Sequence, residues 1–354
     1  MDQTNDVAEV AVLGVGRMGR HHARTYARLP QARLVGVVDF DEDRVETVAD
    51  EYGCTGYTHV ESLLAAHPSL KAVTVAVPTE HHADAARPLL ERGIACLIEK
   101  PIAGSVAEAQ ELADFARRHH AVLQVGHTER FNPAVRAVAK MDITPRFIEI
   151  TRVSPMTFRS MDVGVVMDMM IHDLDVVLSL VNRPIKKIDA VGISVLGAHE
   201  DICDARLTFE GGCVCTFTVS RVALKTERRL RLFSEDAYVS LDYGNRSGIV
   251  VRMTANEQSL DEVREKLRGG QDLSDLNYMD LVAMEELTMD LPPGQEDPLT
   301  AQATAFLHAA ITGGAPVVTA EHGYAAVAAA ERIVETVRAH QWEGLERKAF
   351  EGHA

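Results

Sequence analysis

The fold is decided by the stretch Val10-Ala11-Val12-Leu13-Gly14-Val15-Gly16-Arg17-Met18-Gly19, in which a short apolar run leads directly into the pattern G-x-G-x-x-G and then into a helical pattern. The three glycines permit a tight turn, close approach of a pyrophosphate to the backbone and close packing of the helix on the strand. The start of the helix adds N–H donors and a positive dipole. The sequence therefore predicts a dinucleotide cradle that includes Arg17 and Met18.

A carboxylate ends the second apolar run. Asp39 follows Leu34-Val35-Gly36-Val37-Val38 and lies twenty residues after Gly19. At that position a carboxylate accepts hydrogen bonds from the adenosine ribose and repels a 2′-phosphate. We therefore expect NAD as the cofactor in preference to NADP; the alternative is a glycine turn that binds no ligand.

The first 125 residues alternate short apolar runs with amphipathic stretches. Runs that are β-branched and apolar throughout are typical of parallel strands buried on both faces, and regular alternation with helices predicts an open, doubly wound α/β sheet. The further runs are Ala72–Val77, Ala95–Ile98 and Val122–Val125, and helical patterns cover about 17–28, 41–52, 80–92 and 105–119.

The pattern changes after about residue 145. A helical stretch runs from about Val163 to Leu180, and consecutive alternating segments predict a large, mostly antiparallel sheet with one open face. These segments are Arg146–Val153, Ile188–Gly197, Ala205–Glu210, Cys213–Val222, Arg228–Phe233 and Tyr238–Tyr243, and two closing helices follow at about 299–312 and 321–340. We expect a Rossmann domain over residues 1–125 and a substrate-binding and oligomerisation α+β domain over residues 126–354.

Composition limits the partners and the compartment. The chain has 354 residues and a formal net charge of −16, which disfavours general binding to nucleic acid. Its five cysteines have no Cys-x-x-Cys spacing and are expected to be packed thiols of a reducing compartment. No secretory signal pattern and no long uncharged apolar run is present, so we expect a cytoplasmic protein without a membrane span.

Two further motifs carry acid–base groups. Lys100, in Glu99-Lys100-Pro101, ends the fourth apolar run, at the sheet edge where ligands of α/β folds bind. Asp168 and His172 are four residues apart on the expected helix, so they share one face. A histidine suits the removal of a hydroxyl proton near neutral pH. Taken singly, a surface lysine and a capping or surface histidine are the alternatives. The three His-His pairs lack zinc-ligand spacing, and we expect no metal.

Together these motifs resemble the Gfo/Idh/MocA family of nicotinamide-dependent sugar and cyclitol oxidoreductases over roughly residues 8–182. The resemblance rests on the order and spacing of Gly14-x-Gly16-x-x-Gly19, Pro78-x-x-x-His82, Glu99-Lys100-Pro101, Arg130-Phe131-Asn132-Pro133 and Asp168-x-x-x-His172. It implies Lys100, His172 and Asp168 as catalytic residues. It also implies cofactor contacts from the glycine turn, Asp39, Pro78, Thr79, His82 and Glu99.

Longer segments resemble the branch of the family that oxidises the C3 hydroxyl of UDP-N-acetylglucosamine. These are Gly126–Val135 and Asp162–Asp168. The chain departs from the usual pattern at Thr79, where asparagine is common, and at Met169-Met170, where Leu-Gly or Leu-Ala is common. Both departures bear on the shape of the nicotinamide and sugar pockets, so the substrate is less well defined than the reaction.

The resemblance implies a mechanism in which His172 removes the hydroxyl proton, Lys100 positions the oxygen and Asp168 orients His172 or binds the sugar. Guanidinium groups match phosphates. Candidates for the substrate's phosphates are therefore Arg130, Arg152 and Arg159, with Asn132 as a further substrate contact and surface ion pairs as the alternative. Other substrates remain open: another nucleotide sugar, a free sugar or an inositol. A non-catalytic NAD-sensing regulator is the alternative of another class. The open sheet face predicts a homodimer or homotetramer.

Overall fold

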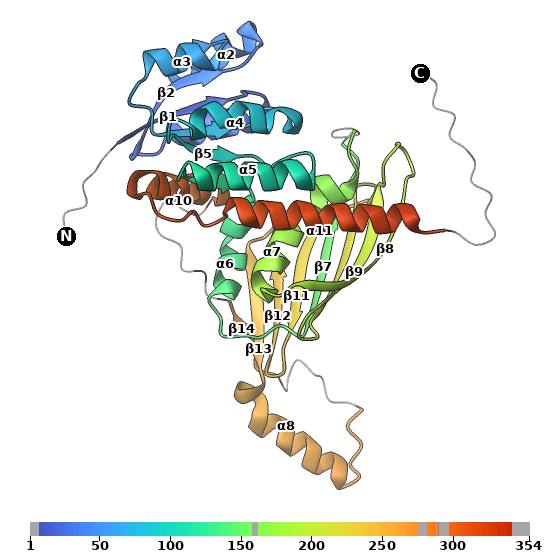
Figure 1. The fold of residues 1–354 in the computed structure, drawn as a ribbon. Coiled ribbons are helices and arrows are strands. Elements are labelled where there is room, and N and C mark those ends of the chain that lie inside the picture. Colours follow the sequence, from blue (N-terminus) through green and yellow to red (C-terminus); the bar gives the residue numbers. More distant parts are fainter. Residues whose placement is uncertain (1–6, 158–161, 275–281, 288, 290–296, 342–354) are drawn as a thin grey trace.

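The computed structural model describes residues 7–157, 162–274, 282–287, 289 and 297–341, and it consists of two units, one above the other in Figure 1. The first unit contains β1 (Ala8–Leu13), α1 (Arg17–Tyr26), β2 (Ala32–Val38), α2 (Glu42–Tyr52), β3 (Thr55–Tyr57), α3 (Val60–Ala66), β4 (Ala72–Val75), η1 (Thr79–His81), α4 (His82–Leu90), β5 (Ala95–Ile98), α5 (Val106–Arg118) and β6 (Leu123–Val125). The second contains η2 (Thr128–Phe131), α6 (Pro133–Ala139), β7 (Phe147–Val153), η3 (Val166–Met170), α7 (Ile171–Val181), β8 (Ile185–Ile193), β9 (Ile202–Phe209), β10 (Val214–Ser220), β11 (Glu227–Phe233), β12 (Ala237–Asp242), β13 (Ser247–Arg252), α8 (Met253–Arg268) and β14 (Glu285–Glu286). Two helices, α10 (Pro298–Thr312) and α11 (Ala320–Ala339), end the described chain.

The first sheet is the predicted doubly wound Rossmann sheet. In the described chain its six strands are all parallel, in the order β3-β2-β1-β4-β5-β6. The apolar runs are buried throughout, as in β4 and β5, because helices cover both faces. The prediction omitted β3 and α3, which are short and carry only one buried side chain, Leu63.

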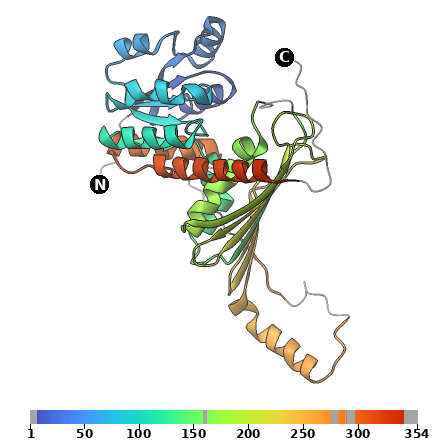
Figure 2. The ribbon, with the colours of Figure 1, turned by 45° about the vertical axis from the view of Figure 1, so that its right-hand side comes forward.

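The second sheet is the predicted open-faced, mostly antiparallel sheet. Its strands follow the order β14-β13-β12-β11-β7-β10-β9-β8, and of the described pairs only β7 with β10 is parallel. Burial alternates along each strand: in β7, Ile148 and Ile150 are buried, whereas Phe147 and Glu149 are partly exposed. Among the described elements, α6, α7 and α11 lie on one face, and no helix covers the other (Figure 2). This arrangement confirms the predicted fold class.

The closing helices connect the two units. Phe306 and Leu307 of α10 belong to the same apolar cluster as Val10 and Val12 of β1, so α10 completes the core of the first unit. Helix α11 crosses the molecule between α5 and α7 (Figure 1) and also contacts β8. The domain boundary at residue 125 stays a prediction, but the packing of α10 ties the end of the described chain to the first unit.

The helix expected from about Val163 to Leu180 differs locally from a regular α-helix. It begins with a π-turn, η3, and continues as α7 to Val181. The strand β13 and the helix α8, which extends beyond the sheet in Figure 2, were not predicted. None of the helices in the described ranges is both long and apolar enough to span a membrane.

Candidate active site

The glycine turn has the space that a dinucleotide needs. Gly14 has a φ of +78°, and a Cβ there would meet the backbone of Ala76 at 2.7 Å. A Cβ on Gly19 would lie 1.7 Å from the carbonyl oxygen of Gly14, so α1 packs on the strand only without a side chain there. At Gly16, the N-cap of α1, a Cβ would meet nothing within 4 Å. The exposed Arg17 and Met18 follow. The turn therefore fits a pyrophosphate at the start of α1.

Asp39 lies beside this turn, at the carboxyl end of β2. Its Oδ2 accepts a hydrogen bond from the backbone N–H of Val15 at 2.8 Å. Both carboxylate oxygens lie 3.3 Å from Nη1 of Arg44. The residue is 7% exposed. A buried carboxylate next to the cradle agrees with NAD binding, because it can accept hydrogen bonds from a ribose and would repel a 2′-phosphate.

The side chain of His82 contacts the backbone of the segment that follows β4. Its ring is 1% exposed, with Nδ1 2.9 Å from the carbonyl oxygen of Pro101 and Nε2 3.0 Å from that of Val77. Burial lowers the pKa of His82, so the ring is neutral and donates to one of the two carbonyls. His82 thus ties the loop that carries Pro78 and Thr79 to the loop after Lys100, and its expected contact with cofactor stays a prediction.

Glu99 is anchored by a residue that the sequence argument did not single out. His22 of α1 lies 2.7 Å from Oε1 of Glu99, and both residues are buried. Burial opposes ionisation of Glu99, but the hydrogen bond with His22 and the charge of Lys100 outweigh it and lower the pKa of the carboxyl. An ionised Glu99 therefore joins α1, which follows the glycine turn, to the segment that carries Lys100.

Lys100 reaches across from the first unit to the second. Its Nζ lies 2.7 Å from the carbonyl oxygen of Asp168 and 3.1 Å from Oδ1 of the same residue. Asp168 lies in the π-turn η3, so these bonds join the end of β5 to the start of α7. An ammonium group has three donors, and Asp168 takes two of them. One N–H of Lys100 therefore remains for a substrate.

His172 lies one turn further along. Its Nδ1 is fully buried and has no hydrogen-bond partner in the described structure. Nε2 also has no hydrogen bond among the described residues, but it is not fully buried. Nε2 is therefore the nitrogen that a substrate can approach. Burial, with the positive charge of Lys100 second, holds the pKa of His172 well below its usual value, so the ring is a neutral base at neutral pH.

A second histidine, His127, packs against His172. The two rings meet edge to face with centroids 6.3 Å apart. His127 is fully buried, and neither of its ring nitrogens has a partner among the described residues. Burial, followed by the charges of Lys100 and Arg130, lowers its pKa to about 3. Nothing in its sequence context singled out His127 as a neighbour of His172.

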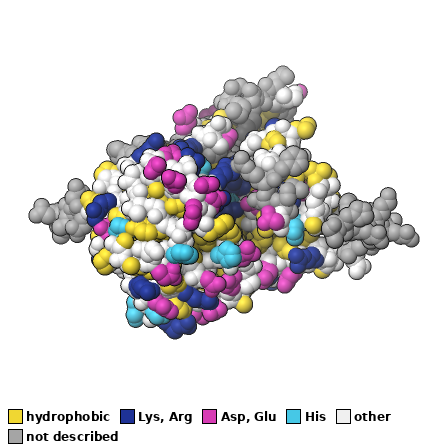
Figure 3. All heavy atoms as spheres, turned by 90° about the horizontal axis from the view of Figure 1, so that it is seen from above, with side chains coloured by type: hydrophobic (Ala, Val, Ile, Leu, Met, Phe, Trp, Pro, Cys, Tyr) yellow, Lys and Arg dark blue, Asp and Glu magenta, His cyan; other side chains and the backbone are white. Residues whose placement is uncertain are grey.

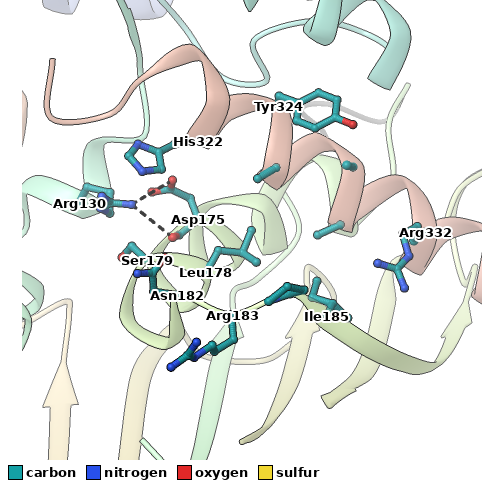
Figure 4. Close-up of a pocket in the computed structure, with 14 residues that line it drawn as sticks. Arg130, Asp175, Leu178, Ser179, Asn182, Arg183, Ile185, His322, Tyr324 and Arg332 are labelled. Carbon is teal, nitrogen blue, oxygen red and sulfur yellow. Dashed lines mark hydrogen bonds and ion pairs between the residues drawn. The ribbon is translucent and has the colours of Figure 1, made fainter. Parts of the chain in front are cut away.

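Arg130 and Asn132, two of the expected substrate contacts, already form hydrogen bonds within the protein. Nη1 of Arg130 lies 3.3 Å from Oδ1 of the buried Asp175 in the wall of a pocket of about 620 Å³ between α7 and α11 (Figure 4). Asn132 is 3% exposed and caps α6 by accepting from the N–H of Ala134. Both side chains therefore stabilise the fold after β6, and the substrate contacts expected of them stay predictions.

Arg152 is the centre of a buried ionic cluster. Its Nε lies 2.5 Å from Oδ2 of Asp173 and its Nη2 lies 2.9 Å from Oδ1 of the same residue. Nη2 also donates to Oε1 of Glu129 at 3.1 Å. Burial opposes the charge of Arg152, but Asp173 outweighs it and raises the pKa of the guanidinium. A phosphate would have to displace these carboxylates. Arg159, the remaining candidate, lies outside the described residues.

The described residues contain no group of three or more His, Cys, Asp or Glu side chains arranged to hold a metal ion.

Among the cysteines, Cys96, Cys203, Cys213 and Cys215 are buried, and burial raises the pKa of each thiol. Acidic and basic side chains are interspersed over the surface seen from above (Figure 3).

Two family models match the chain. "Oxidoreductase family, NAD-binding Rossmann fold" matches residues 8–127, and "GFO/IDH/MocA C-terminal domain" matches residues 145–240. The chain is 37% identical over 235 residues to the UDP-N-acetylglucosamine 3-dehydrogenase of Acidithiobacillus ferrooxidans, which covers 66% of this chain and 74% of that protein. It is 29% identical over 192 residues to the NAD⁺-dependent scyllo-inositol 2-dehydrogenase of Bacillus subtilis, a match that covers 51% of this chain and 56% of that protein.

Solved structures agree. The UDP-N-acetylglucosamine 3-dehydrogenase GnnA of Acidithiobacillus ferrooxidans superposes with a TM-score of 0.80 at 30% identity, over 94% of this chain and 98% of that one. A levoglucosan dehydrogenase in complex with NADH and levoglucosan shares the fold, with a TM-score of 0.79 at 17% identity over 94% and 97%. Because the two models together span more than half of the chain and a dehydrogenase relative shares its fold almost end to end, this chain belongs to the Gfo/Idh/MocA oxidoreductase family and is one of its NAD-dependent dehydrogenases.

Proposed function

We propose that the protein oxidises the C3 hydroxyl of UDP-N-acetylglucosamine to a ketone, with His172 as the base and Lys100 as the group that binds the reacting oxygen. The observation that carries the chemistry is an open Nε2 on His172 whose ring lies close enough to the ammonium group of Lys100, held by Asp168, for that charge to lower its pKa. The similarity to the enzyme of Acidithiobacillus ferrooxidans supports the choice of substrate.

The protonation state of His172 favours base catalysis. Burial and the charge of Lys100 keep the ring neutral, so Nε2 accepts the hydroxyl proton as the carbonyl forms. The same environment disfavours the imidazolium, so His172 releases the proton to solvent after turnover. Bound NAD supplies the acceptor for the hydride from C3.

Lys100 stabilises the charge that develops on the substrate oxygen. Its third N–H is free for that oxygen, and its ammonium group is fixed in place by the two bonds to Asp168. Asp168 also balances the charge of Lys100. In this proposal Asp168 positions Lys100, and the glycine turn and Asp39 would hold the pyrophosphate and the adenosine ribose of the cofactor.

The proposal is tested by adding UDP-N-acetylglucosamine to the NAD-loaded protein and following NADH absorbance, with proton NMR to identify the oxidised carbon. We expect His172→Ala and Lys100→Ala to lower kcat by about 10²–10⁴-fold. Lys187→Ala is the matched control, because Lys187 is in an exposed pair with Asp189 and should leave turnover unchanged. Absence of NADH formation by the NAD-bound protein would refute the substrate.

Other substrates of the same chemistry form the second candidate. The similarity to the scyllo-inositol dehydrogenase of Bacillus subtilis favours a cyclitol. A panel of UDP-N-acetylglucosamine, UDP-glucose, N-acetylglucosamine and myo-inositol, compared by kcat/KM, separates the two candidates. We expect UDP-N-acetylglucosamine to have the highest value.

We also propose that the open face of the second sheet joins copies of the chain. Partly exposed aromatic and polar side chains line this face, among them Phe147, Thr151, Thr216, Phe233 and Tyr238. A large sheet face without a helical cover favours a partner. Light scattering at micromolar concentration should give a dimer or a tetramer, and a monomer would contradict the proposal.

A further inference from the structure

The helix-covered face of the second sheet carries an arginine, Arg228, that the sequence argument did not single out. Arg228 lies on β11 directly opposite Arg152 of β7 in the antiparallel register. Side chains of directly opposed residues lie on the same face of a sheet. Arg228 therefore shares the covered face with Arg152, whose guanidinium bonds to Asp173, the residue after His172.

Contacts within the cluster confirm this placement. Nη1 of Arg228 lies 3.9 Å from Oε1 of Glu129, the same oxygen that accepts from Nη2 of Arg152. The side chain of Arg228 is 48% exposed, whereas those of Arg152 and Glu129 are 6% and 14% exposed. Arg228 is thus the open end of an ionic cluster that begins beside the catalytic histidine.

The other cations around this cluster are compensated at close range. Lys100 is bonded to Asp168, Arg130 to Asp175, Arg152 to two carboxylates, and Arg221 to Asp201 at 2.6 Å.

For Arg228 the described structure gives one ion pair, at 3.9 Å, with a carboxylate that Arg152 and Asn132 already use. Its guanidinium therefore keeps most of its donors available for an anion.

We propose that Arg228 binds the diphosphate of the substrate and thereby selects a nucleotide sugar over a neutral sugar or a cyclitol. The inference rests on the proposed function, because it takes the reacting hydroxyl to lie at His172. In a nucleotide sugar the diphosphate is attached to C1, which one ring carbon separates from C3. The diphosphate must then lie within the length of one sugar ring from His172, and a guanidinium fork matches its oxygens.

The charge of Arg228 also acts on His172, where it is one of the smaller causes of the lowered pKa. A purely electrostatic role would therefore appear as a shift of the acid limb of the pH profile of kcat, with KM unchanged. Direct binding of the diphosphate would appear in KM and in the affinity for a ligand that lacks the sugar. The two roles have different readouts.

The experiment compares Arg228→Gln with Arg229→Gln in the NAD-loaded protein. Arg229 is the matched control: its side chain is 51% exposed, it pairs with Glu227 at 3.5 Å, and it points to the opposite face of the same strand. Steady-state kinetics with UDP-N-acetylglucosamine are measured together with the affinity for UDP by calorimetry.

We expect Arg228→Gln to raise KM for the nucleotide sugar and Kd for UDP by about 10- to 100-fold, the effect of losing a charge-assisted hydrogen bond. The value of kcat should stay near that of the original protein. Arg228→Lys should recover part of the loss, and Arg229→Gln should change neither constant. Unchanged NAD affinity of each variant shows that it is folded.

The result that overturns the inference is UDP affinity in Arg228→Gln equal to that of the original protein, or an equal loss in both glutamine variants. A shift confined to the pH profile overturns it as well. Failure of the proposed function has a different signature: the original protein turns over another sugar but forms no NADH from UDP-N-acetylglucosamine. The UDP measurement still decides the role of Arg228 in that case, because it requires no turnover.

Discussion

Removal of one carboxylate from the buried cluster should destabilise the protein measurably. In Asp173→Ala, Arg152 loses a two-point contact at 2.5 and 2.9 Å in a pair whose side chains are 1% and 6% exposed. Breaking a buried pair by removing one partner costs about 3–5 kcal/mol, because a buried charge loses its compensation. Glu129 remains as a partner at 3.1 Å, so we expect the lower half of this range.

The expected change in melting temperature follows from chain length. At about 2.1 cal/mol/K per residue, 354 residues give an unfolding entropy of about 0.74 kcal/mol/K. A loss of about 3–4 kcal/mol then lowers Tm by about 4–5 °C if the chain unfolds as one unit.

Differential scanning calorimetry of Asp173→Ala and Asp189→Ala provides the test. Asp189 pairs with Lys187 at 2.8 Å, but the side chains are 53% and 66% exposed, so its removal should cost less than about 1 kcal/mol. An equal Tm for the two variants would refute the argument that burial of the Arg152 pair determines its contribution.

Four further predictions follow from the site. Gly16→Ala should keep the Tm, because its Cβ meets nothing within 4 Å, but should weaken NAD binding in a titration by filling the space at the turn. Lys100→Met should raise the pKa of His172 and so move the acid limb of kcat/KM to higher pH; an unchanged limb would contradict the charge argument. Asp39→Ser should lower the ratio of kcat/KM for NAD to that for NADP, and an unchanged ratio would count against Asp39 as the discriminating residue. The folded-state pKa of His127 is about 3, below its unfolded value of about 6.5, so its contribution to stability is present above pH 6.5 and falls as the pH is lowered towards 3. His127→Phe should therefore lose less stability than the original protein between pH 6.5 and 4.5, by about 1.4 kcal/mol per pH unit, in urea denaturation at each pH.

Local pattern was sufficient for most of the fold. The apolar runs of the first unit and the alternating runs of the second became strands within a few residues of the expected positions, because both periodicities report directly on burial. The glycine turn, Asp39 and the helix that carries His172 were also found locally. Among the elements that were not predicted, β3 and α3 are short and bury only Leu63, and α8 is rich in charged residues, so none of these three has a strong apolar pattern.

The roles of the arginines depended on tertiary contacts. From the sequence, Arg130, Arg152 and Arg159 were equally suitable candidates for the phosphates of the substrate. In the fold Arg130 and Arg152 are paired with buried carboxylates, whereas Arg228, seventy-six residues after Arg152, lies beside it with its charge poorly compensated. Charge alone does not indicate which guanidinium is available, since availability depends on the carboxylates that the fold brings near.

The sequence by itself determined the two sheets and the glycine turn, and it supplied Lys100, Asp168 and His172 as the proposed reacting groups, because these depend on residue types at short spacing. Only the tertiary structure decided which nitrogen of His172 is open, that Lys100 is held by Asp168, that His22 anchors Glu99 and that His127 packs against His172. These contacts join segments tens of residues apart. Their energetics come from burial and from the distance between charges, and neither quantity exists until the chain is folded.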